Sequence, residues 1–382
     1  MEEELFIQDY LILNELGSGS YATVYKARHT KTDVIVAMKI IPKEILNTPE
    51  AISTLQSEIE LFKKLDHPFI AHFFENFEDE YNYYIVMEYL EKGDLLDEIN
   101  RSSGIREEIA YKYISQICAA LEYLHCEMHV IHRDIKAENI MLDKYKNVRL
   151  VDFGMSGAFS IHDPLRDTIC GSYPYASPEM LRNEQYTAST DIWSLGILLY
   201  LLLFGALPFQ SSNTALLIKL ITTKEPIIPI DASLEVKDLL RRILVKDPSR
   251  RITIQEIKSH PWVNKFNPSI TFSFDFGSSY SYSSFHHISI NKKITTKLEK
   301  FGYDVSGLQA DVLSGCVSKR TAAYKMIRRQ KIAKRIFIWI SQKARIKGPV
   351  TRVRALSVHQ LLGKKNSFPN IIQDKLKRID TK

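Results

Sequence analysis

The sequence predicts an α+β fold with two unequal lobes, a small β-rich lobe and a larger helical lobe, followed by a C-terminal helical module. Three features support this prediction. Residues 10–40 contain short runs of β-branched and aromatic residues, which are typical of strands. From about residue 94 onward, apolar residues recur at helical spacing. This spacing returns at about residues 293–345, after a stretch dominated by serine and aromatic residues.

The individual elements follow from local composition. We expect strands at residues 10–16, 23–27, 34–40 and 83–87, where β-branched, aromatic and other apolar residues dominate. Residues 50–65 switch to helical spacing, with one apolar side formed by Ile52, Leu55, Ile59, Phe62 and Leu65. Further helical patterns occupy residues 107–125, 190–204, 213–222 and 233–244. The first domain therefore extends over residues 10–263.

One apolar run requires a choice between a membrane span and a buried helix. Residues 192–207 are almost entirely apolar and follow Asp191 directly. The run is near the lower length limit for a helix that crosses a bilayer. We therefore interpret it as a helix in the core of the second lobe.

The N-terminus and the cysteines indicate the compartment. Met1-Glu2-Glu3-Glu4 is acidic and lacks the basic and apolar regions of a signal peptide, and Glu2 excludes N-myristoylation. The cysteines show no metal-ligand spacing, so we expect free thiols at Cys118, Cys126, Cys170 and Cys316. Together these features predict a cytoplasmic protein.

The net charge of +6 hides a strong asymmetry along the chain. Residues 312–382 contain 19 Lys and Arg but only 2 Asp and Glu, a balance of +17. The first 311 residues therefore carry 6 − 17 = −11. An acidic body joined to a basic tail is informative about binding partners and says little about fold.

The segment with the most chemical information is His132-Arg133-Asp134-Ile135-Lys136-Ala137-Glu138-Asn139, and Asp152 follows thirteen residues later. Asp134 supplies a carboxylate base and Lys136 a cation. Asn139 and Asp152 supply oxygen ligands of the type that Mg²⁺ prefers. Few reactions require these groups in this order, and phosphoryl transfer from ATP to a hydroxyl group is one of them.

With Asp152-Phe153-Gly154, this segment resembles the catalytic motifs of eukaryotic protein kinases, and Lys136 resembles the serine/threonine type. The resemblance is to the calmodulin-dependent and AMP-activated (MARK-like) group. It implies a bilobal kinase fold, ATP and Mg²⁺ as cofactors, and protein substrates. Asp134 would be the base, Lys136 would stabilise the transferring phosphoryl group, and Asn139 and Asp152 would hold the metal.

The resemblance also implies a nucleotide site in the first lobe. Glycines between two expected strands let backbone N–H groups approach phosphates, and Lys39 in Val36-Ala37-Met38-Lys39 would neutralise phosphate charge. Glu58 is the expected partner of Lys39, with Glu60 as the alternative. Backbone groups of the hinge would bind adenine. The implied nucleotide-binding residues are Leu16, Gly17, Ser18, Gly19, Ser20, Tyr21, Ala22, Val24, Ala37, Lys39, Glu88, Leu90, Asp94 and Met141.

Regulation is also implied by the resemblance. Thr168 occupies the position of an activating phosphosite, and its phosphate would pair with Arg133 beside the catalytic aspartate. An upstream activating kinase is therefore an expected partner. Asp191 and Arg251 match two scaffold positions, and Arg251 is expected to pair with Glu179.

The remaining chain divides into three parts. Residues 264–292 form a linker rich in serine and aromatic residues, and residues 293–330 resemble a small ubiquitin-associated-like module. Residues 331–382 form a basic, partly disordered tail. For the basic helical segment 321–345, three alternatives stay open: packing on the module, binding to anionic membrane, or binding to calmodulin. Nucleic acid fits less well, because aromatic and basic residues are not interleaved on a recognisable binding fold.

A non-catalytic scaffold with a kinase-like body and a membrane- or calmodulin-binding tail is the alternative from another functional class. A scaffold requires none of the catalytic groups, yet this chain retains Lys39, Asp134, Asn139 and Asp152. The sequence therefore favours an active serine/threonine kinase.

Overall fold

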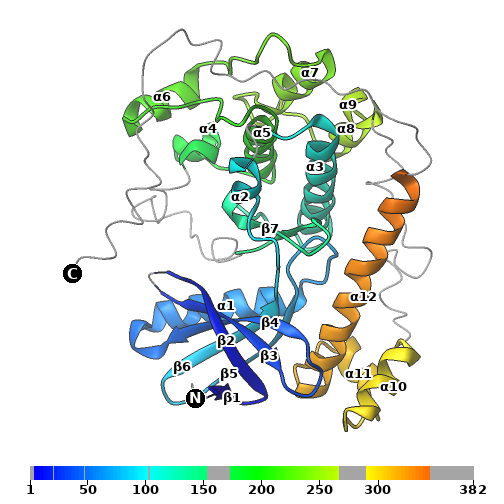
Figure 1. Cartoon of the computed structure of the whole chain (residues 1–382). Helices are drawn as coiled ribbons and strands as arrows, with labels where there is room; N and C mark the ends of the chain where they lie inside the picture. Colours follow the sequence, from blue (N-terminus) through cyan, green and yellow to red (C-terminus); the bar gives the residue numbers. More distant parts are fainter. Residues whose placement is uncertain are drawn as a thin grey trace. The chain divides into compact units, whose positions relative to one another are not determined.

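The computed structural model describes residues 4–19, 21–46, 48–101, 104–152, 173–265 and 290–344 (Figure 1). The first lobe contains a six-stranded antiparallel sheet in the order β1-β2-β3-β4-β6-β5. Its strands are β1 (Phe6–Ile7), β2 (Tyr10–Ser18), β3 (Thr23–His29), β4 (Ile35–Pro42), β5 (Phe73–Glu78) and β6 (Asn82–Glu88).

Helix α1 (Pro49–Lys64) packs on this sheet. The Thr48 side chain accepts a hydrogen bond from the Ala51 N–H, which satisfies one of the unpaired donors at the start of the helix. Leu55 and Ile59 are buried against Ile41, Phe73 and Ile85 of the sheet. This contact fixes the side of the sheet on which α1 lies.

The second lobe is mainly helical and is built around α5. Its helices are α2 (Leu95–Asn100), α3 (Glu107–Glu122), α4 (Pro178–Leu181), α5 (Ser189–Phe204), α6 (Thr214–Thr223), α7 (Leu234–Ile243), α8 (Ile254–Ser259) and α9 (Pro261–Lys265). A short hairpin of β7 (Ile140–Leu142) and β8 (Val148–Leu150) also belongs to this lobe. The predicted α+β bilobal fold is confirmed.

The apolar run 192–207 lies mostly in α5, and residues 190–202 are buried in the core of the second lobe. Within the described ranges, no helix has the length and apolar character needed to cross a bilayer. The prediction of a buried core helix is therefore confirmed. Cys118, Cys126 and Cys316 are free thiols, and Cys170 lies outside the described residues.

The region after the linker contains α10 (Lys292–Lys300), α11 (Leu308–Leu313) and α12 (Lys319–Ala344). Ile294, Leu298, Leu308, Tyr324 and Ile327 share one small hydrophobic core, so α10 and α11 pack on the first half of α12. The boundary expected after residue 330 falls within α12, which continues without interruption to residue 344. The resemblance of residues 293–330 to a ubiquitin-associated-like module stays a prediction.

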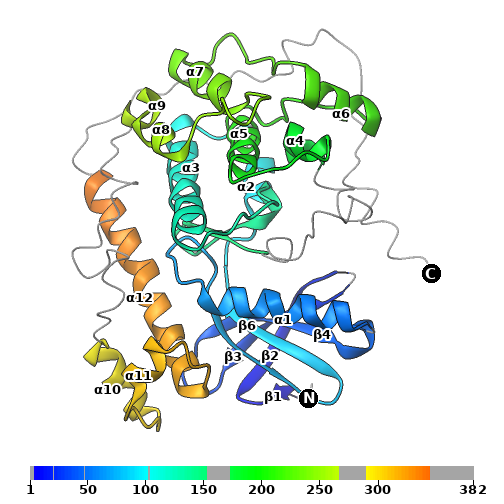
Figure 2. The ribbon, with the colours of Figure 1, turned by 180° about the vertical axis from the view of Figure 1, so that it is seen from behind.

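Helix α12 also packs against both lobes (Figure 2). Ala322 and Met326 lie in the core of the first lobe, and Ile332 and Ile336 lie in the core of the second. The Phe337 ring stacks on Tyr145 with 4.6 Å between centroids. Packing on the module therefore describes only the first half of the basic helix α12, because the second half of α12 packs on the kinase-like body.

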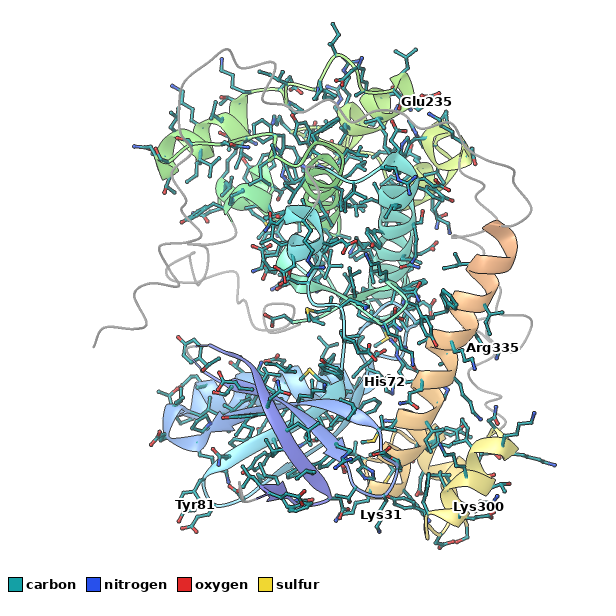
Figure 3. All side chains as sticks on the ribbon, viewed as in Figure 1. Lys31, His72, Tyr81, Glu235, Lys300 and Arg335 are labelled. Carbon is teal, nitrogen blue, oxygen red and sulfur yellow. The ribbon has the colours of Figure 1, made fainter. Side chains whose placement is uncertain are left out.

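Two histidines of the first lobe face this C-terminal region. Figure 3 shows His72 next to α12, whose charged residues Lys325, Arg328 and Arg329 are electrostatic neighbours of the imidazole. The Nε2 atom of His29 lies 3.3 Å from the Tyr303 hydroxyl, which follows α10. The His29 Nδ1 atom accepts a hydrogen bond from the Thr32 N–H at 3.2 Å. His29 is therefore a neutral imidazole whose Nε2–H donates to Tyr303.

We expect acidification to destabilise the folded protein, because a proton on Nδ1 of His29 would end the hydrogen bond that this atom accepts from the Thr32 N–H. Burial lowers the pKa of His29 to about 4, from an ordinary value of 6.5. Because the folded-state pKa is the lower one, the stabilising contribution is complete above pH 6.5 and is lost as the pH falls toward 4. In the His29→Gln variant, the free energy of unfolding should therefore fall less than in the wild type when the pH is lowered from 7 to 5. The expected difference is about 1 kcal/mol.

Urea unfolding at several pH values measures how steeply the free energy of unfolding depends on pH. Burial also lowers the pKa values of His67, His72 and His132, but these side chains are present in both proteins, so the difference isolates His29. Equal slopes for wild type and His29→Gln would contradict the assignment.

Candidate functional site

Three polar side chains converge in the loop that precedes β7. The Lys136 Nζ atom lies 2.6 Å from Oδ2 of Asp134. The Asn139 Nδ2 atom donates to the same oxygen at 2.7 Å and to the Asp134 backbone oxygen at 3.0 Å. Asp134 and Asn139 are buried, while Lys136 is half-buried. The structure thus brings together the predicted base, cation and amide.

Asp191, at the start of α5, fixes the backbone of this loop. Its carboxylate accepts hydrogen bonds from the His132 N–H at 2.9 Å and the Arg133 N–H at 2.8 Å, and it lies 2.7 Å from Nε2 of His125. Burial opposes ionisation of Asp191, but the hydrogen bond and charge of His125 outweigh it, so the pKa lies below its ordinary value. The scaffold role expected for Asp191 agrees with these contacts.

Two residues in this region have positive φ angles, Arg133 at 71° and Asp152 at 62°. Such a conformation is uncommon outside glycine and is retained only where surrounding contacts enforce it. At Arg133 the enforcing contact is the hydrogen bond to Asp191. The Arg133 guanidinium also lies 5.3 Å from the centroid of the Tyr186 ring.

Asp152 follows β8 and is tied to the catalytic loop by its neighbour, because the Val151 N–H donates to the Asn139 carbonyl at 3.0 Å. The Asn139 amide nitrogen binds Asp134, so its side-chain oxygen is the atom that remains to bind a metal. Among the described residues, no cluster of three or more His, Cys, Asp or Glu side chains forms a metal site. Two oxygen ligands beside bound phosphates fit Mg²⁺, which usually takes few ligands from the protein.

Lys39 and Glu58 are electrostatic neighbours. Lys39 lies in β4 opposite Val24 of β3, and it is half-buried. No ion pair within 4.0 Å joins it to Glu58, although both residues are among those described. Burial raises the pKa of Glu58, and the charge of Lys39 opposes this increase. The alternative partner, Glu60, is exposed and pairs with Lys63 at 2.7 Å.

The glycine-rich turn follows β2. The Gly19 N–H donates to the Ala22 carbonyl at 2.9 Å and closes the turn, while Ser20 lies outside the described residues. A Cβ atom placed on Gly17 would meet nothing within 4 Å, and one placed on Gly19 would make only an ordinary contact. Leu16 and Tyr21 beside the turn are exposed. Packing in the described residues therefore does not account for either glycine.

The hinge begins where β6 ends. Ala37 of β4 lies opposite Met87, Glu88 is the last residue of β6, and Leu90 is buried. Asp94 pairs with Met141 through a backbone bridge, and its carboxylate caps α2 by accepting from the Asp97 N–H at 2.7 Å. Capping by Asp94 is a structural role that the motif comparison did not reveal.

Two further predictions concern the second lobe and the activation segment. Arg251 and Glu179 form a buried bidentate ion pair, with N–O distances of 2.7 and 2.9 Å, which confirms the expected pairing. Thr168 and Gly154 lie outside the described residues.

Sequence reasoning missed one buried network behind the hinge. The Glu88 side chain, the fully buried Arg149 of β8 and Arg329 of α12 are joined by ion pairs. Arg149 stands within the otherwise apolar run Val148–Val151, and a charge in a buried strand indicates a partner. That signal identifies Arg149 but not its partners.

A curled sheet joined to a helical lobe, with Asp134, Lys136 and Asn139 grouped beside Asp152, defines a protein kinase domain. The family model described as protein kinase domain matches residues 10–263, and the chain belongs to this family. Family membership confirms the resemblance found in the sequence.

Three relatives illustrate the similarity of this chain to other kinases. The serine/threonine-protein kinase SIK2 of Gallus gallus is 39% identical over 255 residues, covering 66% of this chain and 32% of the relative. The human SNF-related serine/threonine-protein kinase is 39% identical over 257 residues, covering 66% and 33%. An Aurora kinase of Eremothecium gossypii is 34% identical over 266 residues, covering 70% and 72%.

The chain spans about a third of the length of SIK2 and of the SNF-related kinase. The family match and these two relatives support a kinase domain of the serine/threonine type in the AMP-activated and MARK-like group.

Proposed function

We propose that this chain is a serine/threonine protein kinase that transfers the γ-phosphoryl group of ATP to hydroxyl groups of protein substrates. The observation that carries the proposal is the contact of Asp134 with both Lys136 and Asn139, beside Asp152. This arrangement supplies a base, a cation and metal ligands around one point, as phosphoryl transfer requires.

Each residue then has a defined part. Asp134 orients the substrate hydroxyl and accepts its proton, and Lys136 stabilises negative charge on the transferring group. Asn139 and Asp152 would hold Mg²⁺, which supplies charge neutralisation to the ATP phosphates when it is bound. The contact of Lys136 with Asp134 orients the carboxylate.

The first lobe supports the nucleotide half of the proposal. Glycine at positions 17 and 19 leaves open space where phosphates would approach the backbone. Lys39 would neutralise the phosphates and Glu58 would hold Lys39. The lack of an ion pair within 4.0 Å between the described residues Lys39 and Glu58 fits a resting state, and we expect this pair to form before catalysis.

Transfer of labelled phosphate from ATP to a serine peptide with basic residues tests this function. We expect Mg²⁺-dependent transfer by the wild type, loss of transfer with a chelator, and at least a hundredfold loss in Lys39→Met, as expected for removal of one phosphate-binding charge. If activated wild type transfers no more phosphate than Lys39→Met, the scaffold function replaces the kinase function.

We further propose that phosphorylation of Thr168 by an upstream kinase activates the enzyme. A phosphate adds about 1.5 to 2 negative charges, and Arg133 next to the catalytic Asp134 is its expected partner. Thr168→Ala should lower the activity of protein pre-treated with an activating kinase about tenfold, and Arg133→Met should produce a similar loss. Activation that persists in Thr168→Ala would place the switch elsewhere.

A further inference from the structure

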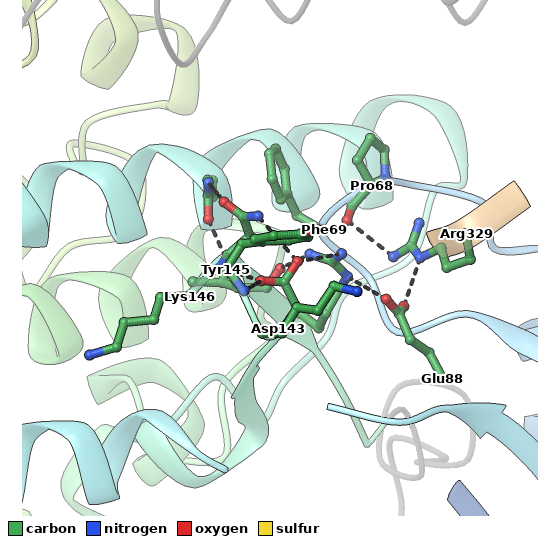
Figure 4. A network of polar contacts seen from close by, with 12 residues as sticks. Pro68, Phe69, Glu88, Asp143, Tyr145, Lys146 and Arg329 are labelled. Carbon is green, nitrogen blue, oxygen red and sulfur yellow. Dashed lines mark hydrogen bonds and ion pairs between the residues drawn. The ribbon is translucent and has the colours of Figure 1, made fainter. Parts of the chain in front are cut away.

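Arg329 of α12 inserts its side chain behind the hinge of the kinase domain (Figure 4). Its guanidinium donates to the backbone carbonyls of His67 at 3.0 Å and Pro68 at 3.1 Å, and to the carbonyl of Ile70. The Nε atom donates to Oε2 of Glu88 at 2.7 Å. The side chain is only 4% exposed, so these contacts replace its hydration almost completely.

Glu88 is held from two sides. Its Oε1 accepts from Nε of Arg149 at 3.1 Å, while its Oε2 accepts from Arg329. Arg149 continues the network to Asp143, whose Oδ2 atom lies 3.0 Å away. Glu88 is also the last residue of β6, and its N–H donates to the His72 carbonyl at 2.9 Å. The rotamer and the backbone of the first hinge residue are therefore both fixed.

The carbonyls that Arg329 binds belong to a loop that reaches the metal-binding segment. The Leu150 N–H donates to the Phe69 carbonyl, and the Ala71 N–H donates to the Leu150 carbonyl, both at 2.9 Å. Leu150 precedes Val151 and Asp152, and Val151 binds Asn139. One guanidinium thus contacts the hinge residue and the loop that aligns the strand before Asp152.

We propose that Arg329 is a positioning residue of the nucleotide site, so that ATP binding depends on a helix outside the kinase domain. The proposal rests on the proposed function for its substrate, ATP. Arg329 acts through Glu88 and through the loop from His67 to Ala71. Both contacts order backbone that adenine and the metal-bound phosphates would meet, which lowers the entropy lost when the nucleotide binds.

The neighbouring contacts show why α12 is a stable constituent of this site. Arg328 pairs with Asp66 at 2.7 Å, and Asp66 directly precedes His67, whose carbonyl Arg329 binds. Met326 and Ile332 are buried in the cores of the first and second lobes, on either side of this pair of arginines. Removal of α12 would expose both cores and take one hydrogen-bond donor from each of three backbone carbonyls.

The test measures binding of a fluorescent ATP analogue with Mg²⁺, and KM for ATP and for a serine peptide, in the full chain. Arg329→Met should weaken analogue binding and raise KM for ATP about tenfold, with KM for the peptide unchanged and kcat within about twofold. Arg329→Lys keeps the positive charge but loses the planar, multiply donating guanidinium group. Its affinity for the analogue should therefore lie between those of the wild type and Arg329→Met. Lys334→Met removes one exposed positive charge from the same helix and should match the wild type.

Reciprocity gives a second readout that does not depend on catalysis. If α12 favours nucleotide binding, then the nucleotide must stabilise α12 by the same factor. The analogue should slow amide hydrogen exchange in residues 322–338 of the wild type and of Lys334→Met, but not of Arg329→Met.

Unchanged analogue affinity in Arg329→Met would overturn the proposal, and so would a rise in kcat, which would mark α12 as an inhibitory element. Because the analogue is measured by binding alone, a chain that binds it without transferring phosphate would refute the kinase function and leave this inference standing.

Discussion

Asp134→Asn should lower kcat for phosphoryl transfer about 10³-fold while leaving ATP binding nearly unchanged. General base catalysis contributes about 10² to 10⁴ to the rate, and an amide cannot accept the substrate proton. The substitution also removes the charge that holds Lys136 at 2.6 Å, so part of the loss reflects a misplaced cation. Phosphate transfer to a serine peptide measures kcat, and a fluorescent ATP analogue measures binding.

The matched control is Asp33→Asn. This residue is exposed, lies between β3 and β4, and has a positive φ of 59°, a conformation that asparagine accepts as readily as aspartate. The chemical change is the same, so its kcat should equal that of the wild type. Asp134→Asn with more than a tenth of wild-type kcat would exclude Asp134 as the base.

The regular parts of the fold were predictable because their periodicity is local. The strands around residues 10–16, 23–27 and 34–40 correspond to β2, β3 and β4, and the helix over 50–65 corresponds to α1. Strand β5 was missed, because Phe73-Phe74-Glu75-Asn76-Phe77-Glu78 does not alternate between apolar and polar residues. The bulge between Phe73 and Glu75 disrupts the period of two on which the prediction depends.

The catalytic loop was predictable for a different reason. Asp134, Lys136 and Asn139 lie within six residues of one another, so their spacing alone brings them together once the loop is held. Asp191, which matched a scaffold position of the family, fixes the loop by accepting hydrogen bonds from the backbone of His132 and Arg133. These hydrogen bonds are visible only in the structure.

The buried network behind the hinge was beyond sequence reasoning. Arg329 and Glu88 are separated by 241 positions, and neither belongs to a pattern that specifies the other. In the sequence, Arg329 is one of many basic residues in a basic region, so its burial has no local signal. Long-range polar contacts of this kind depend on how α12 docks, and docking is decided by the apolar residues on several of its faces.

Arg251→Met should lower the free energy of unfolding by about 3 to 5 kcal/mol, because it leaves the Glu179 carboxylate buried without a counter-charge. Both side chains are 0% exposed, and the ion pair is bidentate. Arg251 also donates to the carbonyls of Ser189 and Val245, which lose their partner. For a domain of this size the fall corresponds to about 10 °C in the thermal midpoint, which calorimetry or fluorescence measures.

Arg242→Met supplies the comparison, because Arg242 pairs with Asp238 at 3.0 Å while the two side chains are 60% and 48% exposed. An exposed pair contributes about 1 kcal/mol or less, since water already solvates both charges. The double variant Glu179→Gln with Arg251→Met should recover part of the stability, because it removes the buried charge that the single variant leaves unpaired. Equal thermal midpoints for Arg251→Met and Arg242→Met would show that burial does not set the contribution of the Arg251 ion pair to stability.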